Sequence, residues 1–168
     1  MADWFESVSD TGVLVCHIGF STLPGHLSNS GSWLAQRRRS TVSADNLCPP
    51  GSKGAEFIDE LCPVEGEAII YKHRYSGFKS TNLGTILRAH RTETCVVTGV
   101  STNVCVESTI REAFELDHYV VVPEDGVASW DMDLHRATLE TIRHRFGTVT
   151  TVDAVAAIWR ESGRMAAE

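Results

Sequence analysis

The chain has 168 residues and a mass of 18.4 kDa, the size of one domain with a core of its own. Its composition, 42% hydrophobic and 22% charged, is that of an ordinary globular protein. The formal net charge of −7 argues against a nucleic-acid surface, which needs a basic face. No stretch approaches the roughly 18 consecutive apolar residues of a membrane span, so we expect no membrane partner.

The cysteines and the first residues indicate the compartment. Five cysteines form no C-x-x-C pair, and their odd number argues against a disulfide framework or a zinc ribbon. The start, MADWFESVSD, lacks the basic and hydrophobic pattern of a secretion signal. We therefore expect a cytoplasmic protein without an organic cofactor or a metal. His135 could join Asp131 and Asp133 as metal ligands, but a hydrogen-bonded core histidine is the better interpretation.

Short apolar runs alternate with helical patterns along the chain. The runs predict strands at residues 13–18, 68–71, 95–98, 119–122 and, more weakly, 148–152. Apolar residues at helical spacing predict helices around residues 83–87, 106–116, 135–146 and 152–159. Because continuous apolarity is typical of strands covered on both faces, the pattern predicts an open, mainly parallel α/β sheet with helices on both faces, in a single domain spanning residues 1–168. Residues 21–53, rich in Ser, Gly, Asn and Pro, predict a long irregular excursion that shapes a site or a subunit contact.

The carboxyl ends of two predicted strands carry candidate chemistry, and ligands bind at that end of an open parallel sheet. Cys105 follows the strand at 95–98 and falls in the first turn of the next helix, with Thr102 or Asn103 as a good N-cap. The free amides and the dipole there favour a thiolate and could hold an oxyanion. Lys72 ends the strand at 68–71, and it would lie near Cys105 if these strands are neighbours. A nearby ammonium group stabilises a thiolate.

Two longer motifs surround these residues and carry a family resemblance. They are KHRYSGF at residues 72–78 and VTGVSTNVCVESTIREA at residues 97–113, followed by VVPEDGVA at residues 121–128. Together they resemble the isochorismatase-like cysteine hydrolases over nearly the whole chain. The motifs are most similar to those of ureidoacrylate amidohydrolases. These enzymes belong with N-carbamoyl amidohydrolases, which cleave C–N bonds beside a urea-like carbonyl.

The resemblance implies a role for each matched residue. It implies Cys105 as the nucleophile, Lys72 as its charged partner, and a cis peptide between Val100 and Ser101. The backbone amides of Ser101 and Cys105 would then form the oxyanion hole. Tyr75, Phe78 and Asn103 are weaker candidates for the lining of the substrate pocket. Relatives that look like this are usually dimers or tetramers, so we expect a homodimer or homotetramer.

The amino-terminal part departs from the family pattern. Family members carry an aspartate, which acts as the general base and acid, at the end of a first strand. The strand at 13–18 matches the family's second strand, so this chain is expected to lack the first strand and to be short at its N-terminus. Asp3 and Asp10 precede the strand at the wrong end of the sheet. We therefore expect this chain to be nearly inactive, and a longer form that carries the strand and its aspartate to be active.

The sequence leaves several functions open. The first is hydrolysis of a small amide, ureido or carbamoyl compound through a thioester on Cys105. The second is a catalytically impaired member, or an N-terminally truncated one, that serves as a binding or assembly protein. The third is an isochorismatase-type hydrolase with another small substrate.

Overall fold

A computed structural model describes residues 12–39 and 47–165. It is a parallel α/β protein in which every recorded strand pair is parallel, as the apolar runs predict. The strands are β1 (Cys16–Phe20), β2 (Ala68–Lys72), β3 (Thr94–Val96), β4 (Gly99–Val100), β5 (Tyr119–Pro123), β6 (Val127–Ala128) and β7 (Thr148–Thr150). The longer helices are α2 (Gly31–Arg37), α3 (Leu83–Ala89), α4 (Glu107–Glu115), α5 (Met132–Arg145) and α6 (Val152–Met165).

The strands form three hydrogen-bonded groups. β1 pairs with β2, β5 lies between β3 and β7, and β4 pairs with β6. Because β4 and β6 follow β3 and β5 closely along the chain, their pairing extends the β3–β5 ladder toward its carboxyl end. Among the described residues, no strand pairs with the second edge of β1 or of β3. The resemblance implies that the family's first strand is interior to the sheet, and that stays a prediction.

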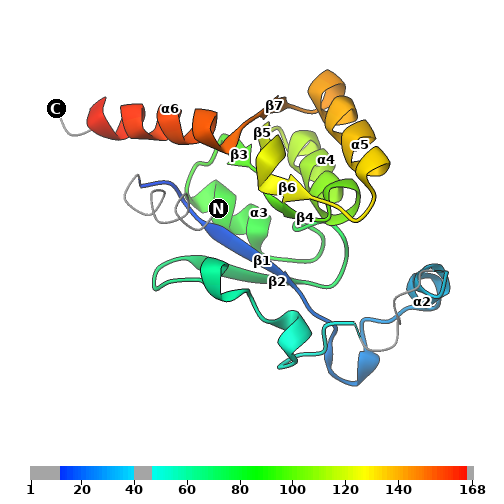
Figure 1. Cartoon of the computed structure of the whole chain (residues 1–168). Coiled ribbons are helices and arrows are strands. Elements are labelled where there is room, and N and C mark those ends of the chain that lie inside the picture. The colour runs from blue at the N-terminus through cyan, green and yellow to red at the C-terminus, as the bar shows by residue number, and fades with distance from the viewer. Residues whose placement is uncertain (1–11, 40–46, 166–168) are drawn as a thin grey trace.

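Helices cover both faces of the β3–β5–β7 group. Alternate side chains of β5 point to opposite faces, so its apolar residues pack against helices on each side. Val120 and Val122 pack in a core with residues of α3, α4 and α5, where Ile110 and Ile142 are fully buried. Val121 packs on the other face with Val155 and Ala156 of α6. Figure 1 shows α4 and α5 on one side of these strands and α6 on the other.

The excursion between β1 and β2 is less irregular than the sequence predicts. Its described part contains α2 and three short 3-10 turns, Pro24–His26, Lys53–Ala55 and Asp59–Leu61. Ser30 begins α2 by accepting a hydrogen bond from the backbone N–H of Trp33 at 3.3 Å, which is a standard N-cap. In Figure 1 this helix stands away from the strands.

Element boundaries differ from the prediction by a few residues. β1 begins at Cys16 rather than at residue 13, because the ladder with β2 starts where Cys16 meets Ala68. β7 ends at Thr150, two residues early, because Val152 already begins α6. Of the apolar run at 95–98, only Cys95 and Val96 lie in a strand, β3, and residues 97–98 precede β4. Within the described ranges, no helix has both the length and the apolarity needed to cross a membrane.

Candidate functional site

Cys105 lies in a tight turn between β4 and α4. The turn is a π-helical segment, Thr102–Val106, and it follows a cis peptide between Val100 and Ser101, which confirms that expectation. The Ser101 carbonyl accepts hydrogen bonds from the backbone N–H groups of Val104 and Val106, both at 3.1 Å. Ser101 is 4% exposed, whereas Cys105 is partly exposed. The turn therefore presents a reachable thiol on a buried backbone.

The predicted N-cap is wrong. Ser101, not Thr102 or Asn103, occupies the cap position, and it makes no side-chain cap bond. The other two side chains bond instead to the segment after β6. Thr102 Oγ1 lies 2.9 Å from His135 Nδ1, and Asn103 Oδ1 accepts from Ser129 Oγ at 2.5 Å. Both side chains hold the turn against its neighbour rather than capping it.

Lys72 is a buried cation at the carboxyl end of β2. Its side chain shares the inner face with Ile70, and it is 5% exposed. The ammonium group donates to the carbonyls of Arg74, at 3.0 Å, and Tyr75, at 2.8 Å, and lies 5.3 Å from the centre of the Phe20 ring. In residues 12–39 and 47–165, no carboxylate is within ion-pair distance of Lys72. A buried ammonium held only by neutral groups favours a nearby anion, such as a thiolate.

The loop after Lys72 is tied to the Cys105 turn through one threonine. Thr109 Oγ1 accepts from the backbone N–H of Gly77 at 2.9 Å and donates to the Cys105 carbonyl at 2.7 Å. β2 does not pair with β3 or β4, so this link, rather than strand pairing, connects the two predicted catalytic segments. Gly77 has no room for a side chain, because an added Cβ would lie 2.9 Å from Ile18 Cδ1.

An aromatic group lies beside Lys72. The Trp33 ring from α2 lies 4.9 Å from the Tyr75 ring and 6.1 Å from the Phe20 ring, and the Arg74 guanidinium sits 5.1 Å from Trp33. Tyr75 thus lies beside Lys72, and its place in a substrate pocket stays a prediction. Phe78 is 8% exposed and packs in the core, so we leave it out of the proposed pocket.

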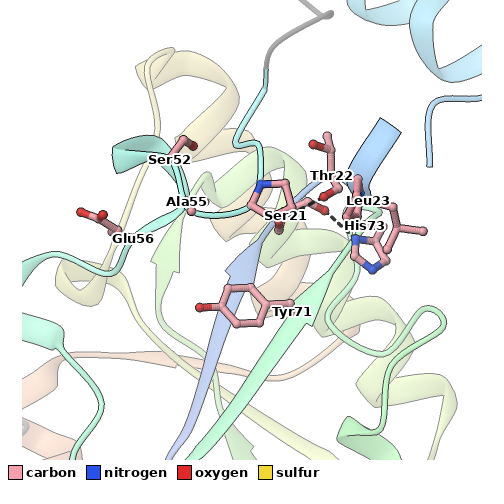
Figure 2. Close-up of a pocket in the computed structure, with 11 residues that line it drawn as sticks. Ser21, Thr22, Leu23, Ser52, Ala55, Glu56, Tyr71 and His73 are labelled. Carbon is pink, nitrogen blue, oxygen red and sulfur yellow. Dashed lines mark hydrogen bonds between the residues drawn. The ribbon is translucent and has the colours of Figure 1, made fainter. Parts of the chain in front are cut away.

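A hollow in the described part of the chain lies away from these residues. Figure 2 shows it, with a volume of about 390 Å³, bounded by Tyr71, Ser52, Glu56 and the His73 ring, whose Nδ1 lies 2.5 Å from the Ser21 carbonyl. Tyr71 and Lys72 point to opposite faces of β2, because neighbouring side chains in a strand alternate. The hollow therefore contains neither Lys72 nor Cys105.

Comparison with known proteins identifies the family. The isochorismatase domain matches residues 2–154 of the chain. The chain belongs to the isochorismatase family. Ureidoacrylate amidohydrolase RutB from Methylobacterium radiotolerans is 39% identical over 130 residues, which are 77% of this chain and 49% of that protein. RutB from Agrobacterium fabrum is 36% identical over 129 residues, or 76% of this chain and 55% of that protein. The chain thus spans about half the length of these curated relatives.

Solved structures of the family share the fold. An isochorismatase-like hydrolase from Alkaliphilus metalliredigens superposes with a TM-score of 0.75 at 32% identity, covering 94% of this chain and 80% of that one. N-carbamoylsarcosine amidase from Thermoplasma acidophilum gives a TM-score of 0.73 at 28% identity, covering 90% and 80%. Amide and ureido C–N hydrolysis is therefore the chemistry of the relatives.

The structure adds residues that the sequence motifs do not single out. Three side chains contact the turn that carries Cys105. Thr109 bonds to the Cys105 carbonyl, and His135 and Ser129 bond to the side chains of Thr102 and Asn103. Asp131, considered as a metal ligand, instead caps α5 by accepting from the backbone N–H groups of Asp133 and Leu134. The carboxylates considered as replacements for the family aspartate, Asp3 and Asp10, lie outside the described residues.

Proposed function

We propose that this chain cleaves a C–N bond of a small amide, ureido or carbamoyl compound through a covalent intermediate on Cys105. The observation that carries the proposal is the placement of Cys105, a partly exposed thiol in the turn between β4 and α4. Thiols at such helix starts are activated because the unpaired amides and the dipole favour the thiolate. Lys72 is a buried ammonium that precedes the loop linked to the Cys105 turn through Thr109, and we propose that it stabilises a thiolate there.

The proposed reaction has two steps. The Cys105 sulfur bonds to the carbonyl carbon, the C–N bond breaks, and the departing amine takes up a proton. Water then bonds to the same carbon, the S–C bond breaks, and the sulfur regains a proton. In each step the carbonyl oxygen becomes an oxyanion, which the backbone N–H groups of Ser101 and Cys105 are proposed to bind. We propose that the pocket is lined by Asn103, which lies in the turn, and by Tyr75, which lies beside Lys72.

The substrate class is proposed from the relatives. RutB proteins are named for ureidoacrylate and the Thermoplasma enzyme for N-carbamoylsarcosine, and both names describe an acid with a urea-type carbonyl. We therefore propose ureido and carbamoyl acids as the first compounds to test. No organic cofactor is needed, because the thiol, the ammonium and the amides supply the groups for acyl transfer.

A second function is favoured by the surroundings of Lys72. Proton transfer to the leaving amine needs a placed acid, and a lysine held cationic is a poor base. Lys72 contacts only carbonyls and a ring in the described part of the chain. We propose that this chain, without an added aspartate, acylates at Cys105 slowly and therefore turns over slowly, and that binding or assembly is its alternative role.

An ammonia-release assay separates these functions. The chain, its Cys105→Ser variant and a form extended by a strand and helix that carry an aspartate are each given ureido and carbamoyl acids. The hydrolase proposal predicts slow, Cys105-dependent release from the chain and faster release from the extended form. Equal inactivity of all three would favour the binding protein. Robust turnover by the 168-residue chain would refute the requirement for the aspartate.

We also propose self-association in a reducing, cytoplasmic environment. Large apolar side chains are exposed, among them Leu27 at 82%, Ile58 at 61% and Trp130 at 89%. Trp33 is partly covered by Phe20 and Tyr75. A homodimer or homotetramer would cover the exposed side chains. A clean monomer in sedimentation at micromolar concentration would contradict this proposal.

A further inference from the structure

Helix α5 forms hydrogen bonds to residues at both ends of the Cys105 turn. At the first end, Thr102 Oγ1 lies 2.9 Å from His135 Nδ1. At the second end, Glu107 Oε2 accepts from Thr138 Oγ1 at 3.1 Å. His135 and Thr138 lie about one turn apart on α5, and both are buried. The turn therefore has an external brace that is made by one face of one helix.

The Thr102–His135 contact is the innermost part of this brace. Thr102 is 0% exposed and His135 is 8% exposed, so neither group can exchange its partner for bulk water. Thr102 directly follows Ser101, whose amide is proposed to bind the oxyanion. A π-helical turn is also an uncommon geometry that occurs frequently at functional sites. Loss of the contact would leave a buried hydroxyl unsatisfied and free Thr102 to shift.

We propose that His135 is a positioning residue that fixes the Cys105 turn through Thr102. The proposal rests on the proposed function only in naming Cys105 and Ser101 as the reacting turn. His135 acts through the Thr102 hydroxyl and not on the substrate. Small displacements matter here, because misplacing catalytic groups by about 1 Å can slow a reaction about 100-fold.

The test uses two readouts on the intact chain. One is the rate at which iodoacetamide alkylates Cys105, followed by peptide mapping, and it requires no substrate turnover. The other is the single-turnover rate of Cys105 acylation by a carbamoyl acid, measured across substrate concentrations. His135→Leu should slow acylation by about 100-fold at saturation, with the half-saturating concentration changed by less than about threefold. Alkylation should slow by about tenfold, since the Cys105 sulfur loses its fixed surroundings.

Matched variants separate positioning from stability. Thr102→Val should reproduce the His135→Leu rates, and the double variant should be no slower than either single one, because the two groups act as a unit. His135→Asn, whose amide reaches about as far as Nδ1, should restore both rates to within about threefold. Ile142→Val, two turns further along α5 and fully buried, should lower the melting temperature and leave both rates unchanged.

The outcomes distinguish this proposal from the proposed function. If His135→Leu lowers the melting temperature but keeps rates like those of Ile142→Val, His135 is structural and the proposal is overturned. If His135→Leu does not fold, His135→Asn and Thr102→Val carry the same comparison. If the native chain shows no acylation at all, the hydrolase function fails, and the alkylation rates still decide whether His135 positions the turn.

Discussion

Replacing Thr109 with valine should weaken the link between the two halves of the candidate site. Valine has nearly the same shape as threonine, so no cavity forms, but both hydrogen bonds of the hydroxyl are lost. Thr109 is 7% exposed and Gly77 is also buried, so the Gly77 N–H is left without a partner away from water. Such an orphaned buried donor costs about 1–3 kcal/mol, so we expect the free energy of unfolding to fall by about 2 kcal/mol.

Urea unfolding followed by circular dichroism measures this loss, and the melting temperature should fall by roughly 4–8 °C. Thr109→Ser is the matched control, because it keeps the hydroxyl and removes only a methyl group, at a cost of about 0.5–1.5 kcal/mol. The valine variant should be the less stable of the two and should also change the alkylation rate of Cys105. A loss below about 0.5 kcal/mol for valine, or a larger loss for serine, would refute the assigned role of this hydroxyl.

Three further perturbations have defined outcomes. Lys72→Met should slow the alkylation of Cys105 at neutral pH, since a nearby ammonium favours the thiolate, and an unchanged rate would make Lys72 irrelevant to the thiol. Gly147→Ala should lower the free energy of unfolding by about 3 kcal/mol, because its Cβ would lie 2.3 Å from the Val120 carbonyl oxygen, whereas Gly31→Ala, with no atom within 4 Å, should change it by less than about 0.5 kcal/mol. Burial, aided by a nearby thiol, raises the pKa of Cys95 to about 11, so the folded state holds a proton that the unfolded chain loses near pH ~8.5. Stability should therefore fall between those pH values, and less steeply in Cys95→Ala; equal slopes in urea titrations would contradict this.

The sequence predicts the strands and helices well where local patterns decide them. Continuous apolar runs predict β2 and β5 to within a residue, because the side chains of both strands are mostly apolar. β1 begins three residues and ends two residues later than predicted, because its ends are set by the register with β2, which lies about fifty positions further along the chain. Register of this kind depends on a partner that local patterns do not contain.

In the candidate site too, local sequence patterns predict some features, whereas others depend on residues far away in the chain. Cys105 and Lys72 stand out because each follows a predicted strand, and the motif around them is specific. The bonds of Thr102 and Asn103 could not be predicted, since their partners lie 33 and 26 positions away. His135 shares a helical face with Leu139 and Ile142, which indicates burial, but only the fold shows that this face meets the Cys105 turn.

The central claim is that Cys105 forms the covalent intermediate, and mass spectrometry of the protein after brief exposure to a ureido or carbamoyl acid tests it most directly. This measurement detects a single acylation even if turnover is slow. The account predicts an acyl or carbamoyl adduct on the peptide that contains Cys105 and no adduct in Cys105→Ala. An adduct on Cys48 or Cys62, or none on a folded chain whose Cys105 is readily alkylated, would contradict it.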